Sequence, residues 1–274
     1  MKSTQIRLAS RPQGEPVAGD FEKVEVDLPE PGEGQVALRT IYLSLDPYMR
    51  GRMSDARSYA APVEIGGVIT GGTVCQVVAS GSETFKEGDY VLSMSGWQSA
   101  DVVDAKTIRK LDPADAPIST AVGVLGMPGL TAYVGLLDIG QPKAGETVVV
   151  SAASGAVGSV VGQLARIKGA RAVGVAGSAE KVAFVKEELG FDACVSHRSD
   201  SLKDDLAAAC PKGVDVYFEN VGGATLDAAL SLMNPFGRIP VCGMISLYNA
   251  TSLDGGPSRA RLMRQILTDR LHIQ

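Results

Sequence analysis

Histidine is scarce in this sequence, and that scarcity limits the chemistry open to it. The 274 residues include two histidines, His197 and His272, and four cysteines that stand apart from one another. No histidine has zinc-ligand spacing to a cysteine, and no two cysteines have the spacing of a metal cluster. Isolated cysteines are also untypical of secreted, disulfide-bonded domains. We therefore expect a reduced, cytoplasmic protein without a metal site.

Long apolar runs are lacking too. Residues 1–14 hold no apolar stretch of signal-peptide length, and no later stretch is long enough to span a bilayer. The formal net charge of −5 gives no reason to expect nucleic acid or an anionic membrane as a partner. What is present is an ordinary composition, 45% hydrophobic and 21% charged, in a chain long enough for about two domains.

Short extended runs bounded by glycine turns fill the first 120 residues. Residues 35–45 are rich in branched and aromatic side chains, and residues 72–79 and 90–92 form further apolar runs. Gly81 and Gly88 mark the turns between the last two runs. Strands and turns of this kind are typical of a small, partly open β-barrel. We predict that residues 1–120 form this first domain.

Residues 121–274 instead alternate between strands and helices. The spacing predicts strands at 147–150, 172–176, 193–195, 214–218, 238–241 and 270–273. It predicts helices at 130–137, 157–167, 179–189, 202–209, 226–233 and 262–267, with Ser178 as the N-cap of the third. Because parallel strands need a crossover each time, this alternation predicts an α/β domain with a doubly wound, Rossmann-type sheet.

A turn of small residues follows the first of these strands. Residues 151–156 are alanine, serine and glycine only, and the apolar face of the next helix starts at Val157. A helix N-terminus offers unpaired N–H groups and the positive end of the helix dipole, and small residues let phosphates approach the backbone. At the first strand of six, the pattern formed by Ala152, Gly155 and Gly158 predicts a site for a dinucleotide pyrophosphate.

The second predicted strand ends without a carboxylate. Sites selective for NAD usually carry Asp or Glu there, about 20 residues after the glycines, bonded to the ribose 2′-hydroxyl. Here the strand runs into Gly177 and Ser178, and Lys181 follows one helical turn later. Lys181 is either a charged partner for a 2′-phosphate or an ordinary solvated lysine. The missing acid predicts NADP(H) as the cofactor.

The missing metal ligands predict the kind of reaction. Dehydrogenases that join a small barrel to such a sheet often use zinc to polarise the oxygen of an alcohol or ketone. Without that Lewis acid, hydride delivery to an already electron-poor, conjugated carbon is the easier reaction. The sequence therefore predicts a zinc-independent oxidoreductase that reduces carbon–carbon double bonds.

Five strings resemble a known family, and they occur in the family's order. They are LSLDPYMR (43–50), GMPGLTAY (126–133), AASGAVG (152–158), ENVGG (219–223) and CGMISLYN (242–249). The chain resembles the zinc-independent medium-chain dehydrogenases/reductases of the leukotriene B4 12-hydroxydehydrogenase and prostaglandin reductase group, including the NADPH-dependent curcumin reductases. The resemblance implies a GroES-like catalytic domain, a Rossmann domain over 121–274, NADPH, a homodimer and reduction of α,β-unsaturated ketones and aldehydes (enones).

The resemblance also implies a segment that follows the position of Gln274 in family members. That segment closes the catalytic domain and adds an asparagine that contacts the cofactor. We expect the partly open barrel to lack this closing segment in the chain as given.

Residue roles follow from the same resemblance. It implies cofactor contacts by Gly155, Ala156, Val157, Gly158, Lys181, His197, Asn220, Cys242, Gly243, Met244, Ile245, Ser246, Tyr248, Met127 and Thr131. The glycine turn would hold the pyrophosphate, Lys181 the 2′-phosphate, and Asn220 with the loop 242–248 the ribose and nicotinamide. His197 replaces a tyrosine common in the family near the 2′-phosphate, which keeps a hydrogen-bond donor there.

Two tyrosines are candidates for stabilising the negative charge that develops on the carbonyl oxygen of an enone. Tyr248 comes first, because it lies in the loop after the fifth strand, beyond the carboxyl end of the sheet where ligands bind. Tyr48, from the first domain, comes second. Both also fit an ordinary role in which the ring is buried and the hydroxyl bonds water. Cys242 has no base near it in the sequence and is expected to be a small apolar contact.

Three other functions share parts of this pattern. A quinone reductase has the same fold without zinc, although the string DPYMR (46–50) argues against it. An enoyl-thioester reductase should carry a basic patch for the phosphates of its carrier, and the sequence shows none. The third is a non-catalytic NADPH-binding sensor, which binds the cofactor but does not turn over an enone.

Overall fold

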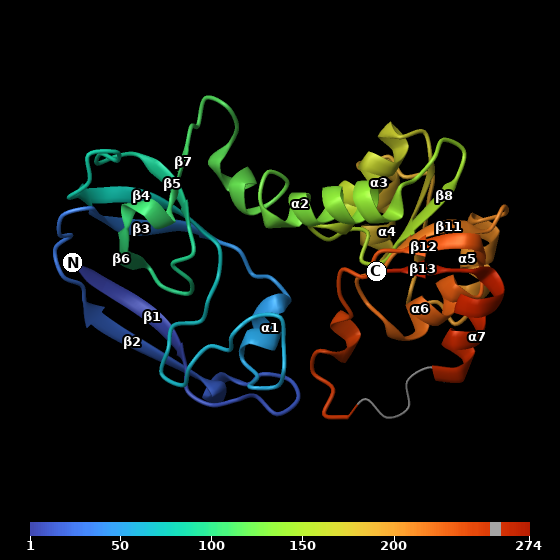
Figure 1. Ribbon diagram of the computed structural model, residues 1–274, viewed down its shortest axis with the longest axis horizontal. Helices are drawn as coiled ribbons and strands as arrows, with labels where there is room; N and C mark the ends of the chain where they lie inside the picture. The colour runs from blue at the N-terminus through green and yellow to red at the C-terminus, as the bar shows by residue number, and fades with distance from the viewer. Residues whose placement is uncertain (253–258) are drawn as a thin grey trace. The chain divides into compact units, whose positions relative to one another are not determined.

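The computed structural model describes residues 1–252 and 259–274 (Figure 1). By packing, the chain forms two compact units, Met1–Met127 and Pro128–Gln274. Within the described ranges no helix is long and apolar enough to cross a membrane.

The first unit is built from antiparallel strands (Figure 1). They are β1 (Lys2–Leu8), β2 (Phe21–Asp27), β3 (Gln35–Leu43), β4 (Thr73–Ser80), β5 (Tyr90–Ser93), β6 (Ala100–Asp104) and β7 (Arg109–Leu111). The short helices are α1 (Tyr48–Arg52), η1 (Ala18–Asp20), η2 (Ala105–Thr107) and η3 (Ile118–Val122). β1 and β2 pair with each other, and the other strands form a sheet in the order β6-β3-β4-β5-β7. As described, these strands leave the barrel open, which confirms the expected GroES-like fold.

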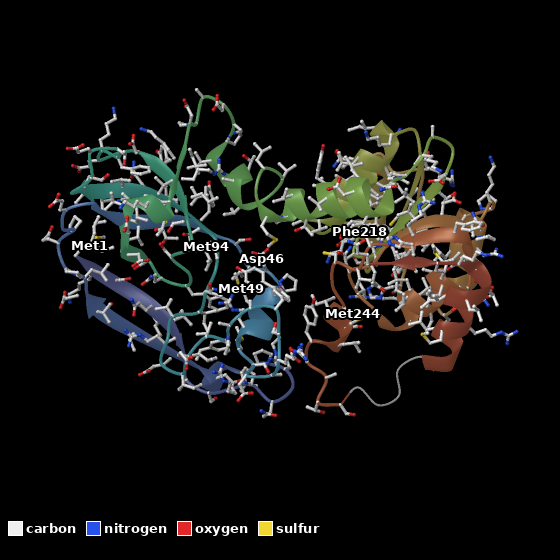
Figure 2. The ribbon with its side chains drawn as sticks, in the orientation of Figure 1. Met1, Asp46, Met49, Met94, Phe218 and Met244 are labelled. Carbon is white, nitrogen blue, oxygen red and sulfur yellow. The ribbon has the colours of Figure 1, made fainter. Side chains whose placement is uncertain are left out.

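Two apolar clusters hold this unit together. Alternate residues of β3, Val36 and Leu38, are fully buried and pack with residues of β4 and β5, as the period of a strand requires. The second cluster lies around α1, where Met49 (labelled in Figure 2) packs with Leu8 and Ile69. This second cluster positions Tyr48, one of the two candidate tyrosines, because the Tyr48 ring packs against it.

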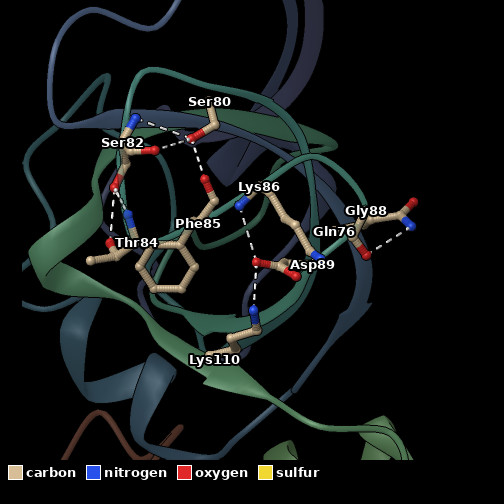
Figure 3. Close-up of polar contacts among 9 residues, drawn as sticks. All are labelled: Gln76, Ser80, Ser82, Thr84, Phe85, Lys86, Gly88, Asp89 and Lys110. Carbon is tan, nitrogen blue, oxygen red and sulfur yellow. Dashed lines mark hydrogen bonds and ion pairs between the residues drawn. The ribbon is translucent and has the colours of Figure 1, made fainter.

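The turn that joins β4 to β5 is held by side-chain hydrogen bonds and an ion pair (Figure 3). The Asp89 carboxylate accepts the Lys86 N–H at 3.0 Å and binds the Lys110 ammonium at 2.8 Å, which ties the turn to β7. The hydrogen bond from Lys110 is the main cause that lowers the pKa of Asp89. The Ser80 hydroxyl closes the turn by donating to the Phe85 carbonyl at 2.7 Å.

The second unit is a parallel sheet with helices on both faces (Figure 1). Its strands are β8 (Thr147–Val150), β9 (Arg171–Ala176), β10 (Ala193–Ser196), β11 (Val214–Phe218), β12 (Met233–Ile239) and β13 (His272–Ile273). Its helices are α2 (Met127–Val134), η4 (Gly135–Gly140), α3 (Gly158–Ile167), α4 (Ala179–Glu187), α5 (Leu202–Ala209), α6 (Gly223–Leu230), η5 (Ile245–Leu247) and α7 (Arg259–Asp269). The strand order β10-β9-β8-β11-β12-β13 is doubly wound, which confirms the Rossmann fold.

Buried residues of β8 pack against helices on both faces of this sheet. Val148 and Val150 pack with α3 and α4 residues, whereas Val149 packs with α5 and α6 residues. Phe218, labelled in Figure 2, is fully buried at the end of the neighbouring strand β11. The chain leaves β8 toward β9 on one side, and β11 lies on the other, so the strand order reverses between β8 and β11. Ligands of doubly wound sheets bind beyond the carboxyl ends of the strands at such a point.

The largest error in the predicted boundaries lies at the start of β12. The sequence predicts a helix through residue 233 and a strand that starts at Arg238, whereas α6 ends at Leu230 and β12 already begins at Met233. Met233 is a helix former, but here it is buried in the core below α5 and α6, and tertiary packing overrides its propensity.

Candidate active site

The turn between β8 and α3 is shaped by its small residues. Ala152 has a left-handed backbone, with φ of 51°, a strained conformation for a residue with a side chain. A Cβ on Gly158 would lie 2.4 Å from the Ala152 carbonyl oxygen, and one on Gly155 would lie 3.2 Å from it. Gly158 therefore has no room for a side chain, because the backbone folds back on itself there.

The N-terminus of α3 points its N–H groups out of this tight turn. Val157 is the N-cap residue, and in the described part of the chain no side chain caps this end of the helix. The Gly155 N–H is bonded within the turn, to the Ala152 carbonyl at 2.9 Å, and the Ser159 N–H is bonded to the Gly155 carbonyl at 3.0 Å. A bare helix N-terminus behind a turn of small residues is what a phosphate requires.

The loop that leads from β11 into α6 is held by a buried carboxylate, although no side chain caps α6 itself in the described part of the chain. Glu219 follows β11, and its Oε1 accepts the N–H groups of Val221 and Gly222 at 2.6 and 2.9 Å. The hydroxyls of Ser151 and Tyr217 donate to the same oxygen, each at 3.1 Å. Burial, and then the Glu219 carboxylate, raise the pKa of Tyr217 well above its usual value, so its hydroxyl keeps its proton and donates.

The other carboxylate oxygen of Glu219, Oε2, is buried and has no hydrogen-bond partner among the described residues. The whole residue is 1% exposed. Glu219 therefore lies below the loops of the site and serves their backbone rather than a ligand.

Glu219 and Ser151 also fix Asn220. The Asn220 N–H donates to the Ser151 hydroxyl, and its side-chain amide donates to the Ser151 carbonyl, both at 2.8 Å. Ser151 directly follows β8 and Asn220 follows β11, so these bonds lie where the strand order reverses. The predicted cofactor residue Asn220 thus stands next to the glycine turn.

A cationic corner lies beyond the ends of β9 and β10. A Cβ on Gly177 would lie 3.1 Å from Nε2 of His197 and 3.8 Å from Nε of Arg198. The Ser196 hydroxyl donates to the Gly177 carbonyl at 2.9 Å and accepts the Arg198 N–H at 3.2 Å. His197 and Arg198 are exposed, so they remain accessible at the place where an NAD site would carry its carboxylate.

Lys181 borders the same corner in the first turn of α4. The Ser178 side chain caps α4 by accepting the Lys181 N–H at 3.3 Å, which confirms the predicted N-cap. The Lys181 side chain is exposed. Its backbone is therefore fixed while its ammonium group remains free to turn toward an anion.

Several hydrogen bonds join the loop 242–248 to the loop that follows β11. The N–H groups of Cys242 and Gly243 both donate to the Glu219 carbonyl, at 2.9 and 3.1 Å. The Ile245 N–H donates to the Asn220 carbonyl at 3.1 Å, and the Ser246 N–H and hydroxyl both donate to the Val221 carbonyl. The structure thus brings Asn220 and the predicted nicotinamide loop together.

Tyr248 closes this loop. Its hydroxyl oxygen accepts the Met244 N–H at 3.3 Å, and its ring is half-buried. Met244, labelled in Figure 2, is 40% exposed. Because the Tyr248 oxygen accepts a hydrogen bond here, its own O–H remains available to donate to a substrate oxygen.

Cys242 is not set up as a nucleophile. Although the residue is exposed, the surrounding protein desolvates the thiol, and the Glu219 carboxylate adds to that effect, so the pKa of Cys242 is raised. A raised pKa lowers the thiolate fraction, which is the reactive form.

Tyr48 lies in the first unit, at the start of α1. Burial raises the pKa of Tyr48, the Asp46 carboxylate raises it further, and Arg52 acts in the opposite direction. Its hydroxyl therefore stays protonated near neutral pH and can donate.

The predicted contacts Met127 and Thr131 both lie on α2, with Met127 44% exposed at its start. Their contact with a cofactor stays a prediction. The described residues contain no group of three or more His, Cys, Asp or Glu side chains that could hold a metal ion.

Comparison with known proteins places the chain in a family. Residues 4–111 match the family model described as the N-terminal domain of oxidoreductase, and residues 156–270 match the one described as zinc-binding dehydrogenase. The NADPH-dependent curcumin reductase of Escherichia coli is 56% identical over 268 residues, which cover 97% of this chain and 78% of that protein. The chain belongs to the prostaglandin reductase group of medium-chain dehydrogenases/reductases.

Two further relatives support this assignment. The NADP⁺-dependent 2-alkenal reductase of Nicotiana tabacum is 43% identical over 265 residues, covering 93% of this chain and 76% of that protein. The crystal structure of CurA from Vibrio vulnificus in complex with NADPH is 53% identical, with a TM-score of 0.94, covering 99% of this chain and 81% of that one.

The residues of this medium-chain reductase also fit a dinucleotide on structural grounds. Gly158 has no room for a Cβ, the α3 N-terminus is bare, and the Gly177 corner carries cations. Two residues that matter here were missed by the sequence analysis. Arg198 follows directly after His197, and that position was the available signal. Glu219 begins the string ENVGG (219–223), but its role could not be found there because the role depends on contacts across the sheet.

Proposed function

We propose that this chain is a zinc-independent, NADPH-dependent reductase of the carbon–carbon double bond in α,β-unsaturated ketones and aldehydes. The observation that carries the proposal is the pairing of two features at one sheet edge. The bare N-terminus of α3 suits a diphosphate, and the corner at Gly177, with His197 and Arg198, suits a 2′-phosphate. The names of the relatives, which reduce curcumin and 2-alkenals, support the choice of substrate class.

The geometry supports the following binding roles. Residues 155–158 bind the diphosphate, with the backbone N–H groups of residues 156–158 as donors because the Gly155 N–H is already bonded to the Ala152 carbonyl. Lys181, His197 and Arg198 bind the 2′-phosphate. Asn220 and the loop 242–248 line the ribose and nicotinamide, and Met127 and Thr131 add contacts from α2. Glu180 is an acidic residue in the first turn of α4, beyond the end of β9. It therefore does not stand at the position where a carboxylate would bind the ribose of NAD.

Bound NADPH supplies the hydride that adds to the β-carbon of the enone. Negative charge then develops on the substrate's carbonyl oxygen, and the Tyr248 hydroxyl stabilises it by donating a hydrogen bond. Tyr48 is the second candidate for this donor. The α-carbon takes its proton from Tyr248 or from solvent.

The proposal extends to the whole protein. Residues 1–120 form the catalytic domain and residues 121–274 the cofactor domain. The protein acts as a homodimer in the cytoplasm.

Single-turnover oxidation of NADPH tests the function. We expect a simple enone to oxidise bound NADPH, with NADH a much poorer donor, and Tyr248→Phe to lower kcat by about 10²-fold. Tyr48→Phe is the matched variant for the second donor. Faster turnover of a quinone than of an enone would favour a quinone reductase, and binding of NADPH without oxidation by either would favour a sensor.

A further inference from the structure

Gly243 lies close to the hydroxyl group of Tyr248. A Cβ on Gly243 would lie 2.7 Å from the Tyr248 hydroxyl oxygen and 3.8 Å from the ring carbon that carries it. A real Cβ does not come this close to another atom. The glycine therefore leaves the space in which the hydroxyl rests.

The backbone conformation does not require glycine at this position. Gly222 and Gly223, in the neighbouring loop, have left-handed backbones, whereas Gly243 does not. An alanine would fit the backbone angles of Gly243 without strain. The requirement at Gly243 is for space alone.

The backbone around Gly243 is held on several sides. Its own N–H donates to the Glu219 carbonyl at 3.1 Å, and the Ile245 N–H donates to the Asn220 carbonyl at 3.1 Å. The Ser246 N–H donates to the Val221 carbonyl at 3.0 Å. A methyl group on Gly243 must therefore displace the end of the Tyr248 side chain rather than the loop.

We propose that Gly243 is a positioning residue, whose missing side chain lets the Tyr248 hydroxyl oxygen accept a hydrogen bond from the Met244 N–H. That hydrogen bond fixes the direction in which the Tyr248 O–H points. The inference rests on the catalytic role given to Tyr248 in the proposed function. An oxygen that accepts the Met244 N–H presents its O–H away from that amide. A donor held in place before the reaction needs no reorganisation as charge develops on the substrate.

The test is Gly243→Ala in the full chain. We expect kcat for an enone to fall at least about tenfold, since a displacement of about 1 Å costs on the order of 10²-fold in rate. We expect the midpoint of thermal unfolding to change little, because only the flexible end of one side chain must move. Gly19→Ala is the matched control, because a Cβ there meets nothing within 4 Å of the described atoms.

A double-mutant cycle with Tyr248→Phe isolates the mechanism. If Gly243 acts through the Tyr248 hydroxyl, Gly243→Ala has little further effect in the Phe background, where that oxygen is gone. Losses that multiply in the double variant would overturn the proposal, as would an unchanged kcat in Gly243→Ala. A lowered NADPH affinity in Gly243→Ala alone would mean that the methyl group crowds the cofactor, and would overturn it too.

A readout without turnover separates this inference from the proposed function. Hydrogen exchange of the Met244 amide, followed by NMR, should accelerate to the same extent in Gly243→Ala and Tyr248→Phe, because both remove its acceptor. Unchanged exchange in Gly243→Ala would overturn the positioning role whatever the substrate. Accelerated exchange in a protein that reduces no enone would leave the positioning intact and refute the function.

Discussion

Two strand-to-helix turns of the same sheet, β8–α3 and β11–α6, differ in the charge that they place beside a helix N-terminus. At α3 no side chain of the described residues caps the helix, and the turn is made of small residues. No described side chain caps α6 either, but in the loop just before it the buried Glu219 carboxylate accepts the N–H groups of Val221 and of the N-cap residue Gly222. Both strands lie beside the point where the strand order reverses.

The difference shows how a sheet with several helix N-termini directs an anion to one of them. Every helix N-terminus attracts negative charge. The Glu219 carboxylate places a negative charge beside the N-terminus of α6, which would repel a phosphate, and the Ser178 hydroxyl caps α4. The N-terminus of α3 has neither a capping side chain nor a carboxylate in its turn, and this suits the diphosphate.

Removing the Glu219 carboxylate from the loop before α6 should have the largest effect on the free energy of unfolding. Glu219→Ala leaves the N–H groups of Val221 and Gly222 without an acceptor in a buried place. Since a buried unsatisfied donor costs about 1–3 kcal/mol, we expect a loss of about 3 kcal/mol in the free energy of unfolding. Urea denaturation measures it.

Glu219→Gln is the matched variant for this prediction. It keeps an oxygen at the position of Oε1, which accepts all four hydrogen bonds, and should be clearly more stable than Glu219→Ala. Equal stability of the two variants would show that the hydrogen bonds to Oε1 do not hold this turn.

Filling the turn at α3 should have the next largest effect. In Gly158→Ala the new Cβ meets the Ala152 carbonyl, which is backbone and cannot move aside, so we expect a loss of about 1–3 kcal/mol in stability. Affinity for NADPH and NADH should fall together, because both carry the same diphosphate. Fluorescence titration with each cofactor measures this.

Gly155→Ala offers a graded control, since its Cβ would lie at the longer distance of 3.2 Å from the same oxygen. It should be milder in both stability and affinity. A variant at Gly158 that retained full affinity for both cofactors would refute the diphosphate site at α3.

Removing Arg198 should have the smallest effect and the most selective one. One exposed charge-assisted contact to a phosphate is worth about 1.4 kcal/mol, so Arg198→Ala should raise the Kd for NADPH about tenfold and leave that for NADH unchanged. Lys168→Ala, an exposed cation at the opposite end of α3, is the control. Equal weakening of both cofactors would place Arg198 outside the 2′-phosphate site.

The repeating parts of the fold could be predicted from the sequence. The alternation of apolar runs located all the strands of the parallel sheet, and the small residues after Val150 marked the turn that the structure shows at Ala152 and Gly158. Ser178 was predicted as the N-cap of α4 and caps it. These features depend on neighbours in the chain, so a local pattern is enough to find them.

The predictions were poorer where neighbours are distant in the chain. The antiparallel unit contains strands that the pattern did not mark, such as β1 and β2. β1 buries the polar residues Ser3 and Gln5, and β2 alternates only between half-buried and exposed residues. Tyr248 was predicted as a candidate from its place after the fifth strand. That Gly243 makes room for its hydroxyl could not be predicted, because a glycine reveals nothing of what fills its space.

By itself, the sequence determined the Rossmann alternation, the small-residue turn before α3 and the absence of a carboxylate after β9. These are properties of residue type and spacing, which local backbone chemistry converts directly into structure. Only the tertiary structure decided that Glu219 accepts the N–H groups before α6, that Arg198 reaches the Gly177 corner and that Tyr248 rests on Gly243. The Gly177 corner joins loops that follow two different strands. The other two contacts each lie within one loop, and hydrogen bonds between the loops after β8, β11 and β12 hold those loops in place.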